Sequence, residues 1–202
     1  RISCVSSDLV NNLPKRLAAR STVIYNHVSA ISVDEHGTTG DEDLAPALGW
    51  IAEQRTRGRR VVLAFGLFLR RKNFDALIRA IESLGGVSLL LVGRGPEEAT
   101  LKNAACGMET DGRVLIHPFL PQPARLCAFV DVYVSCSQSE GFGLANVEAA
   151  RSGTPTIVPC HAVNLEVLSG FSNVTFYNPY ASHHLSETVK GIVAPSAQRH
   201  AP

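Results

Sequence analysis

The chain has 202 residues, in which 19 lysines and arginines nearly balance 18 aspartates and glutamates, for a formal net charge of +1. This balance argues against the strong basic field with which proteins bind a nucleic-acid backbone, so we expect no nucleic-acid partner. Hydrophobic residues make up 45% of the chain. That share excludes wholesale disorder and predicts one globular domain with room for a linker.

The five cysteines are scattered, odd in number and without a CxxC pair. This usage predicts reduced thiols in a cytoplasmic protein. No apolar run approaches the ~18 residues that a membrane-spanning helix needs. The chain begins with Arg1 rather than Met, and its first apolar run is too short for a signal peptide. We therefore expect a fragment or a processed chain.

The first part of the chain predicts a short strand at residues 2–5, a helix, and a second strand at 23–25. Ser6 or Ser7 can cap the helix, and Pro14 interrupts it. An acidic stretch without clean periodicity covers residues 29–49, which we interpret as an exposed linker. A short helix is expected near its end, at about 44–54.

From residue 61 onward, apolar strands alternate with amphipathic helices. This alternation predicts an α/β fold with a doubly wound, parallel, six-stranded sheet, on which ligands bind outside the carboxyl ends of the strands. The expected strands are 61–65, 87–92, 114–117, 132–134, 156–158 and 174–177, and the expected helices are 74–84, 97–105, 123–129, 144–151 and 185–193.

Two of the loops at those ends have ambiguous patterns. The loop after the first strand holds Gly66 and the cations 70–72, which can neutralise a phosphate or form a solvated charge cluster. The loop after the second strand reads Gly93-Arg94-Gly95-Pro96, and Glu98 occupies the position of the third glycine of a dinucleotide fingerprint. A NAD-type site is therefore disfavoured.

The most informative segment is Glu140-Gly141-Phe142-Gly143, directly before the helix that carries Glu148. Glycines let the backbone turn tightly, and the start of a helix offers unpaired N–H groups to an anion such as a diphosphate. The two carboxylates can accept hydrogen bonds from sugar or ribose hydroxyls. The alternatives are a charge partner for the helix start at Glu140 and an exposed helix residue at Glu148.

Residues 140–155 fit the pattern written roughly E-G-F-G-x4-E-A-x-A-x-G-x-P, except that Arg151 stands at its second alanine. The chain thereby resembles the C-terminal, donor-binding half of retaining family 4 glycosyltransferases, which have the GT-B fold. Further matches follow in the expected order at Asn26, Val28, Gly66, Lys72, residues 93–96 and Glu166. The resemblance divides the chain into a remnant of the N-terminal domain and hinge (1–28), a linker with a short helix (29–58) and a Rossmann-like donor domain (59–202).

The resemblance implies a UDP- or GDP-sugar as donor substrate, and neither a separate cofactor nor a metal. Glu140, which holds the transferred sugar, and Lys72, which balances the diphosphate, are the expected catalytic residues. Retention then relies on electrostatic stabilisation of the leaving diphosphate rather than on an enzyme nucleophile. The other residues expected to bind the donor are Gly66, Arg71, Gly93, Phe119 against the base, Gly141, Phe142, Gly143, Leu144, and Glu148 on the ribose.

Three positions depart from that pattern. Leu67 stands where an arginine is usual, His27 replaces the hinge glycine, and residues 160–165 lack the usual Gly-Gly. The resemblance also leaves the acceptor-binding N-terminal domain as a missing partner, so we expect the isolated chain to be inactive. A non-catalytic nucleotide-sugar-binding or regulatory domain is the alternative, and a GT-B nucleotide-sugar epimerase is a third, less favoured one. Peripheral membrane association of the parent protein stays open.

Overall fold

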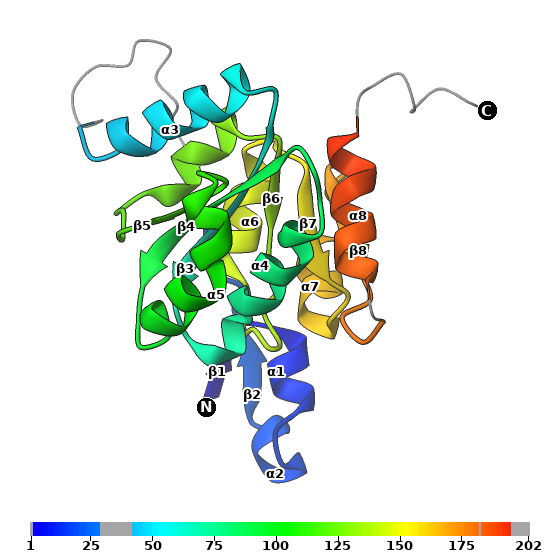
Figure 1. Cartoon of the computed structure of the whole chain (residues 1–202). Helices are drawn as coiled ribbons and strands as arrows, with labels where there is room; N and C mark the ends of the chain where they lie inside the picture. Colours follow the sequence, from blue (N-terminus) through cyan, green and yellow to red (C-terminus); the bar gives the residue numbers. More distant parts are fainter. Residues whose placement is uncertain (1, 29–41, 182, 195–202) are drawn as a thin grey trace.

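The computed structural model describes residues 2–28, 42–181 and 183–194 (Figure 1). Most of the predicted linker, at 29–41, lies outside the described residues, as do Arg1, residue 182 and residues 195–202. The prediction for those parts therefore stays a prediction.

The main body is an α/β sandwich around one six-stranded sheet, as the alternating pattern predicts. The strand order is β5-β4-β3-β6-β7-β8, and each neighbouring pair is parallel. The elements are α3 (Ala45–Thr56), β3 (Arg60–Leu67), the 3-10 turn η1 (Arg70–Lys72), α4 (Phe74–Glu82), β4 (Val87–Arg94), α5 (Glu98–Thr110), β5 (Val114–His117), the 3-10 helix η2 (Pro123–Phe129), β6 (Val132–Val134), α6 (Leu144–Arg151), β7 (Thr156–Pro159), α7 (Ala162–Leu168), β8 (Val174–Tyr177) and α8 (His184–Val193).

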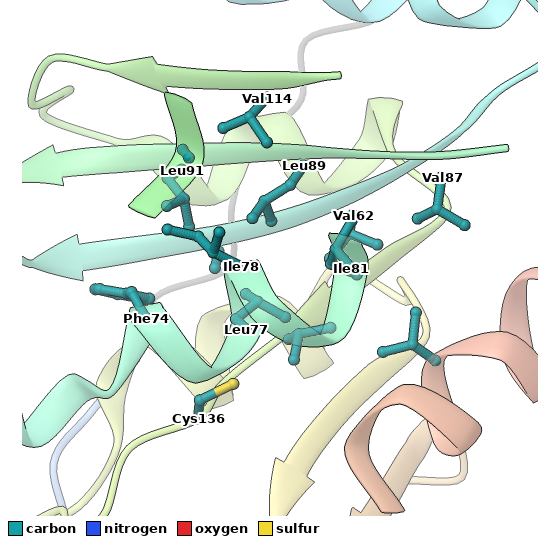
Figure 2. Packing of buried hydrophobic residues seen from close by; sticks show 14 of the residues in the cluster. Val62, Phe74, Leu77, Ile78, Ile81, Val87, Leu89, Leu91, Val114 and Cys136 are labelled. Atoms are coloured by element: carbon teal, nitrogen blue, oxygen red, sulfur yellow. The ribbon is translucent and has the colours of Figure 1, made fainter. Parts of the chain in front are cut away.

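Alternate residues of the central strands face opposite layers of helices. Val62 of β3 packs in the layer of α4, α5 and α8, whereas Leu63 faces α3, η2 and α6. Figure 2 shows the first layer, with Leu77 and Ile81 of α4 directed toward the sheet. Because both faces of the sheet are covered, the strands are apolar throughout rather than alternating. The buried layer also includes the thiol of Cys136, and Cys127 lies in the opposite layer.

The strand order reverses between β3 and β6. From β3 the chain proceeds outward through β4 to β5, then crosses back to β6 and continues to β8 on the other side. In sheets of this type the crevice at the carboxyl ends of the two strands flanking the reversal is the usual ligand position. This geometry places the loops after β3 and β6 next to each other.

The N-terminal segment, residues 2–28, forms a small separate unit below the carboxyl ends of the main sheet (Figure 1). Strands β1 (Ile2–Cys4) and β2 (Ser21–Val23) are parallel, and two short helices, α1 (Ser7–Asn11) and α2 (Lys15–Ala18), connect them. The expectation of one interrupted helix is thus refined to two helices. Pro14 precedes α2 as its N-cap residue, where its missing N–H costs nothing.

Candidate functional site

The loops after β3 and β6 meet through an ion pair between two of the predicted catalytic residues. Lys72 Nζ donates to Glu140 Oε1 over 2.5 Å, and Arg71 lies 3.6 Å from the other carboxylate oxygen. The Glu140 side chain is only 8% exposed, so these cations are its partners in a place with little solvent. The residue predicted to balance the diphosphate is therefore bound to the residue predicted to hold the sugar.

Backbone contacts hold the same two loops together. The N–H of Gln138 donates to the carbonyl of Arg71 over 2.7 Å. In the opposite direction, the Arg71 guanidinium donates to the carbonyl of Ser139 over 3.2 Å. These bonds hold η1 against the loop after β6, so Lys72 is positioned by contacts on both sides of the sheet reversal.

Gly93 allows the ends of β3 and β4 to approach very closely at Gly66. A Cβ atom on Gly93 would lie 2.0 Å from the carbonyl oxygen of Gly66, and one on Gly95 would lie 2.5 Å from that of Phe68. Gly66 and Gly95 also have positive φ angles, +143° and +156°, that side-chain-bearing residues rarely adopt. These glycines are therefore explained by the close backbone packing and the backbone angles at the carboxyl ends of β3 and β4.

The glycine turn, which we define as residues 141–143, leads directly into α6. Gly143 is in the left-handed region at φ +80° and ends the turn as the N-cap residue, without a side-chain capping bond. Among the hydrogen bonds of the described residues, none uses the backbone N–H groups of residues 141–145. A row of free donors at a helix start is the arrangement that binds anions.

A buried chain of amides and one hydroxyl supports the start of α6. Tyr133 donates to Asn146 over 3.1 Å, Asn146 donates to Asn164 over 3.1 Å, and Asn164 donates to the carbonyl of Pro159 over 2.9 Å. Burial raises the pKa of Tyr133 far above its ordinary value, so the hydroxyl remains a donor. Sequence reasoning missed this chain, although an asparagine within the otherwise apolar start of a helix was its visible signal.

Glu148 has surroundings opposite to those of Glu140. It lies half-buried on α6, and in the described part of the chain its carboxylate has neither a hydrogen bond nor an ion pair. Burial raises the pKa of Glu148, because nothing compensates the lost hydration. An unpaired, half-buried carboxylate is an acceptor ready for ligand hydroxyls.

Phe119 lies after β5 and is 48% exposed. The guanidinium of Arg94, at the end of β4, stands 4.7 Å from the centroid of its ring. Arg94 is also the register partner of Leu67, so an arginine lies beside the position where this chain has leucine instead of the arginine of the pattern. Together these residues form an exposed flat surface at the carboxyl edge of the sheet.

Glu166, the last residue of the sequence pattern, contacts the N-terminal segment rather than the residues above. Its carboxylate accepts hydrogen bonds from the N–H groups of Ser7 and Asp8 and from the hydroxyl of Tyr25. The Glu166 carboxylate thereby satisfies the first backbone N–H groups of α1. This use was not predicted from the sequence.

The largest-volume cavity described here lies away from this site, and the described residues form neither a metal-type cluster nor a membrane-spanning helix. A cavity of about 760 Å³ lies at the opposite end of the sheet, lined by Arg55, Gly86 and Asp131 among others, and contains none of the predicted site residues. No cluster of three or more His, Cys, Asp or Glu side chains with the arrangement of a metal site occurs in the described ranges. None of the described helices has the length and apolarity needed to cross a membrane. We place the candidate site at the carboxyl edge, where the predicted residues converge.

The comparisons with known proteins agree on one family. The family described as "Glycosyl transferases group 1" matches residues 51–201, more than half of the chain. The lipopolysaccharide core biosynthesis glycosyltransferase LpsE of Rhizobium meliloti (strain 1021) is 36% identical over 97 residues, which cover 48% of this chain and 28% of that protein. The D-inositol 3-phosphate glycosyltransferase of Mycobacteroides abscessus is 36% identical over 131 residues, covering 59% and 28%.

Solved structures confirm the fold. Anabaena HepE, crystallised with UDP and glucose, superposes with a TM-score of 0.72 at 20% identity, over 97% of this chain and 54% of HepE. The expected six-stranded α/β fold of GT-B glycosyltransferases is thus correct. The matched region spans less than a third of the length of both curated relatives.

Proposed function

The chain belongs to the group 1 glycosyltransferase family, and from that membership we propose that residues 59–202 bind the nucleotide-diphosphate-sugar donor of a retaining family 4 enzyme. The observation that carries the proposal is the convergence, at the sheet reversal, of Lys72, Glu140 and a turn with free N–H groups that leads into the helix carrying Glu148. Residues 1–28 would then be the hinge side of an N-terminal acceptor-binding domain, with residues 29–58 as the linker.

The donor diphosphate is assigned to the glycine turn and to Lys72. The free N–H groups of residues 141–145 and the positive end of the α6 dipole favour an anion there. Lys72 Nζ has three protons, and the bond to Glu140 uses one of them. The remaining protons can bind phosphate oxygens while Glu140 stays in place. As the bond between sugar and phosphate breaks, these donors would stabilise the charge that develops on the leaving diphosphate.

The hydroxyl groups of the donor are assigned to the two carboxylates. Glu148, which has no partner in the described residues, suits the ribose. Glu140 suits the transferred sugar, with Lys72 and Arg71 holding its carboxylate in place. Gly66 and Gly93 supply the floor under the phosphates, and Phe119 with Arg94 offers a stacking surface for the base. UDP in the HepE structure favours a nucleotide diphosphate as the ligand class.

Two observations favour the alternative of a non-catalytic nucleotide-sugar-binding or regulatory domain. Leu67, 50% exposed, stands where the pattern has a phosphate-binding arginine, and Glu140 already engages both Lys72 and Arg71. Either feature would weaken the interaction with the diphosphate. The placement of Arg94 beside Leu67 favours the catalytic proposal in return.

Thermal denaturation with nucleotides tests the proposal. We expect millimolar UDP or GDP to raise the melting temperature of the chain by several degrees, since a ligand that binds only the folded state stabilises it. Glu148→Ala should reduce that shift by more than half. Glu109→Ala, which changes an exposed glutamate on α5, should leave it unchanged. A flat response of the unaltered chain to both nucleotides would contradict donor binding.

Both curated relatives are more than three times as long as the region that they match. We expect this chain alone to bind donor but to transfer no sugar, since donor and acceptor must be held together. Transfer to any acceptor by these 202 residues would contradict the assignment of acceptor binding to another domain. A cytoplasmic location, with peripheral membrane association of the parent protein, completes the proposal.

A further inference from the structure

We infer that the N-terminal segment positions the glycine turn, with Ser6, Tyr25 and Glu166 as its positioning residues for the proposed donor site. The inference deepens the proposed function and, for its effect on ligand binding, rests on it. Three independent contacts carry it. Each joins the N-terminal segment either to the turn itself or to the helix α7 that packs beside α6.

Ser6 fixes the orientation of a peptide unit within the turn. Its side chain is fully buried, accepts a hydrogen bond from the N–H of Leu9 at 3.3 Å and donates its one proton to the carbonyl of Gly141 at 2.9 Å. The peptide bond between Gly141 and Phe142 is trans and planar. Holding the carbonyl toward α1 therefore directs the N–H of Phe142 the opposite way. That N–H is one of the free donors proposed to bind the diphosphate.

The space around the turn is closed by the same segment. A Cβ atom on Gly141 would meet the side chains of Leu9 at 3.6 Å and Val5 at 3.9 Å, which are ordinary contact distances. The Phe142 ring is buried in a cluster against which Val5 and Val28 pack, and the Tyr25 ring centroid stands 6.2 Å from its own. The turn is thus held between the start of α1 and the residues that follow β2.

Glu166 connects the two ends of the N-terminal segment. Its Oε1 accepts from the N–H of Ser7 at 2.7 Å and from the hydroxyl of Tyr25 at 2.8 Å, and its Oε2 accepts from the N–H of Asp8 at 3.0 Å. Burial opposes ionisation, but these hydrogen bonds outweigh it and lower the pKa of Glu166. Since both oxygens are engaged, Glu166 acts on the site through Tyr25 and α1 rather than by touching the donor.

The contacts of Ser6, Tyr25 and Glu166 connect the N-terminal segment to the glycine turn and to α7 through residues that lie far apart in the sequence. Ser6 and Gly141 are separated by 135 positions, and Tyr25 and Glu166 by 141. A shift of the N-terminal segment relative to the sheet would therefore change the geometry of the turn. Affinity for the diphosphate should depend on that placement, because hydrogen-bond donors bind an anion only when aimed at it.

The test combines hydrogen–deuterium exchange with nucleotide affinity in four variants. Ser6→Ala, Tyr25→Ala and Glu166→Ala remove the contacts, and Tyr25→Phe retains the ring against Phe142. Thr22→Ala, an exposed change in the same segment, is the matched control. We expect faster exchange of the amides of residues 141–145 in the three disruptive variants, with α5 unchanged. The affinity for UDP or GDP should fall about 3- to 10-fold, and Tyr25→Phe should recover most of the loss seen with Tyr25→Ala.

The two readouts separate the two proposals. If exchange in the turn accelerates but the unaltered chain binds neither nucleotide, the positioning role stands and the proposed donor site fails. If nucleotides bind but the variants change neither affinity nor exchange in the turn, the positioning role is wrong. A variant that only lowers the melting temperature, with the affinity and the exchange pattern of the turn unchanged, would likewise overturn the inference.

Discussion

The two glutamates that the sequence pattern pairs have different roles in the free protein. Glu140 is nearly buried and bound to Lys72 and Arg71. Glu148 is half-buried, and burial raises its pKa. Glu140 is thus paired with neighbouring cations, whereas the carboxylate of Glu148, unpaired among the described residues, lowers the stability of the folded protein at neutral pH. Strained or under-satisfied groups of this kind are typical of binding sites.

Replacing Glu148 by Gln should stabilise the protein at neutral pH. A raised folded-state pKa means that the native chain holds this proton more tightly than the unfolded chain, so stability falls as pH rises above the ordinary value of 4.5. The variant should melt about 1–3 °C higher at pH 7. Its advantage should shrink toward pH ~4, where the wild-type carboxyl is protonated. Thermal melts across that range measure the difference, and a lower melting temperature at pH 7 would contradict it.

The Lys72–Glu140 pair should show strong energetic coupling. Lys72→Met leaves a nearly buried carboxylate with only the more distant Arg71, so we expect a loss of about 1–3 kcal/mol in the free energy of unfolding. Glu140→Gln in the same chain should recover part of that loss. The exposed Arg79–Asp75 pair on α4 is the control, with a coupling of at most ~0.5 kcal/mol. Equal coupling in the two pairs, measured by urea denaturation, would show that burial adds nothing.

At the scale of elements, α6 depends on its neighbours more than on its own sequence. Its N-cap residue Gly143 makes no side-chain capping bond. The buried chain from Tyr133 through Asn146 to Asn164 instead ties its first turn to β6 and α7. The start of α6 can therefore remain ordered while its first backbone N–H groups have no hydrogen-bond acceptor among the described residues.

Asn146→Ala should test that support. It leaves the Tyr133 hydroxyl and the Asn164 amide without partners in a buried place, which costs about 2–4 kcal/mol for two such groups. Asn103→Ala, an exposed change on α5, should cost less than ~0.5 kcal/mol. Urea denaturation of both variants gives the comparison. A loss below ~1 kcal/mol for Asn146→Ala would mean that the chain of bonds contributes little.

Sequence reasoning identified every helix and strand of the main body except η1 and α7. The six strands and helices α4, α5, α6 and α8 were predicted because apolar runs and amphipathic spacing mark them. Helix α7 was missed because its seven residues are too few for a clear periodic pattern. Contacts from Asn164 to Asn146 and from Glu166 to α1 hold it instead, and such partners cannot be read from a local window.

At the scale of the whole molecule, the strand order brings the site together. The sequence indicates that Lys72 and Glu140 both follow strands, but not that those strands are neighbours. The pairing of β3 with β6 places residues 68 positions apart within bonding distance. The contacts of Ser6 and Glu166 were beyond prediction for the same reason. Glycines 66 and 93 were predicted by pattern, and only the structure shows the reasons: Gly93 lies against the backbone of Gly66, and Gly66 has a positive φ angle.

The cysteines lie at different depths, so the rate at which each is alkylated can report opening of the packed layers. Burial raises the pKa of Cys127 and Cys136 to about 12, so neither forms a reactive thiolate while the layers around it stay closed. Cys106 and Cys160 are exposed. Alkylation at pH 8 should therefore modify these two within minutes and the buried pair only at the rate of unfolding, as peptide mass mapping would show. Early labelling of Cys136, just after β6, would reveal breathing at the edge of the sheet beneath the glycine turn.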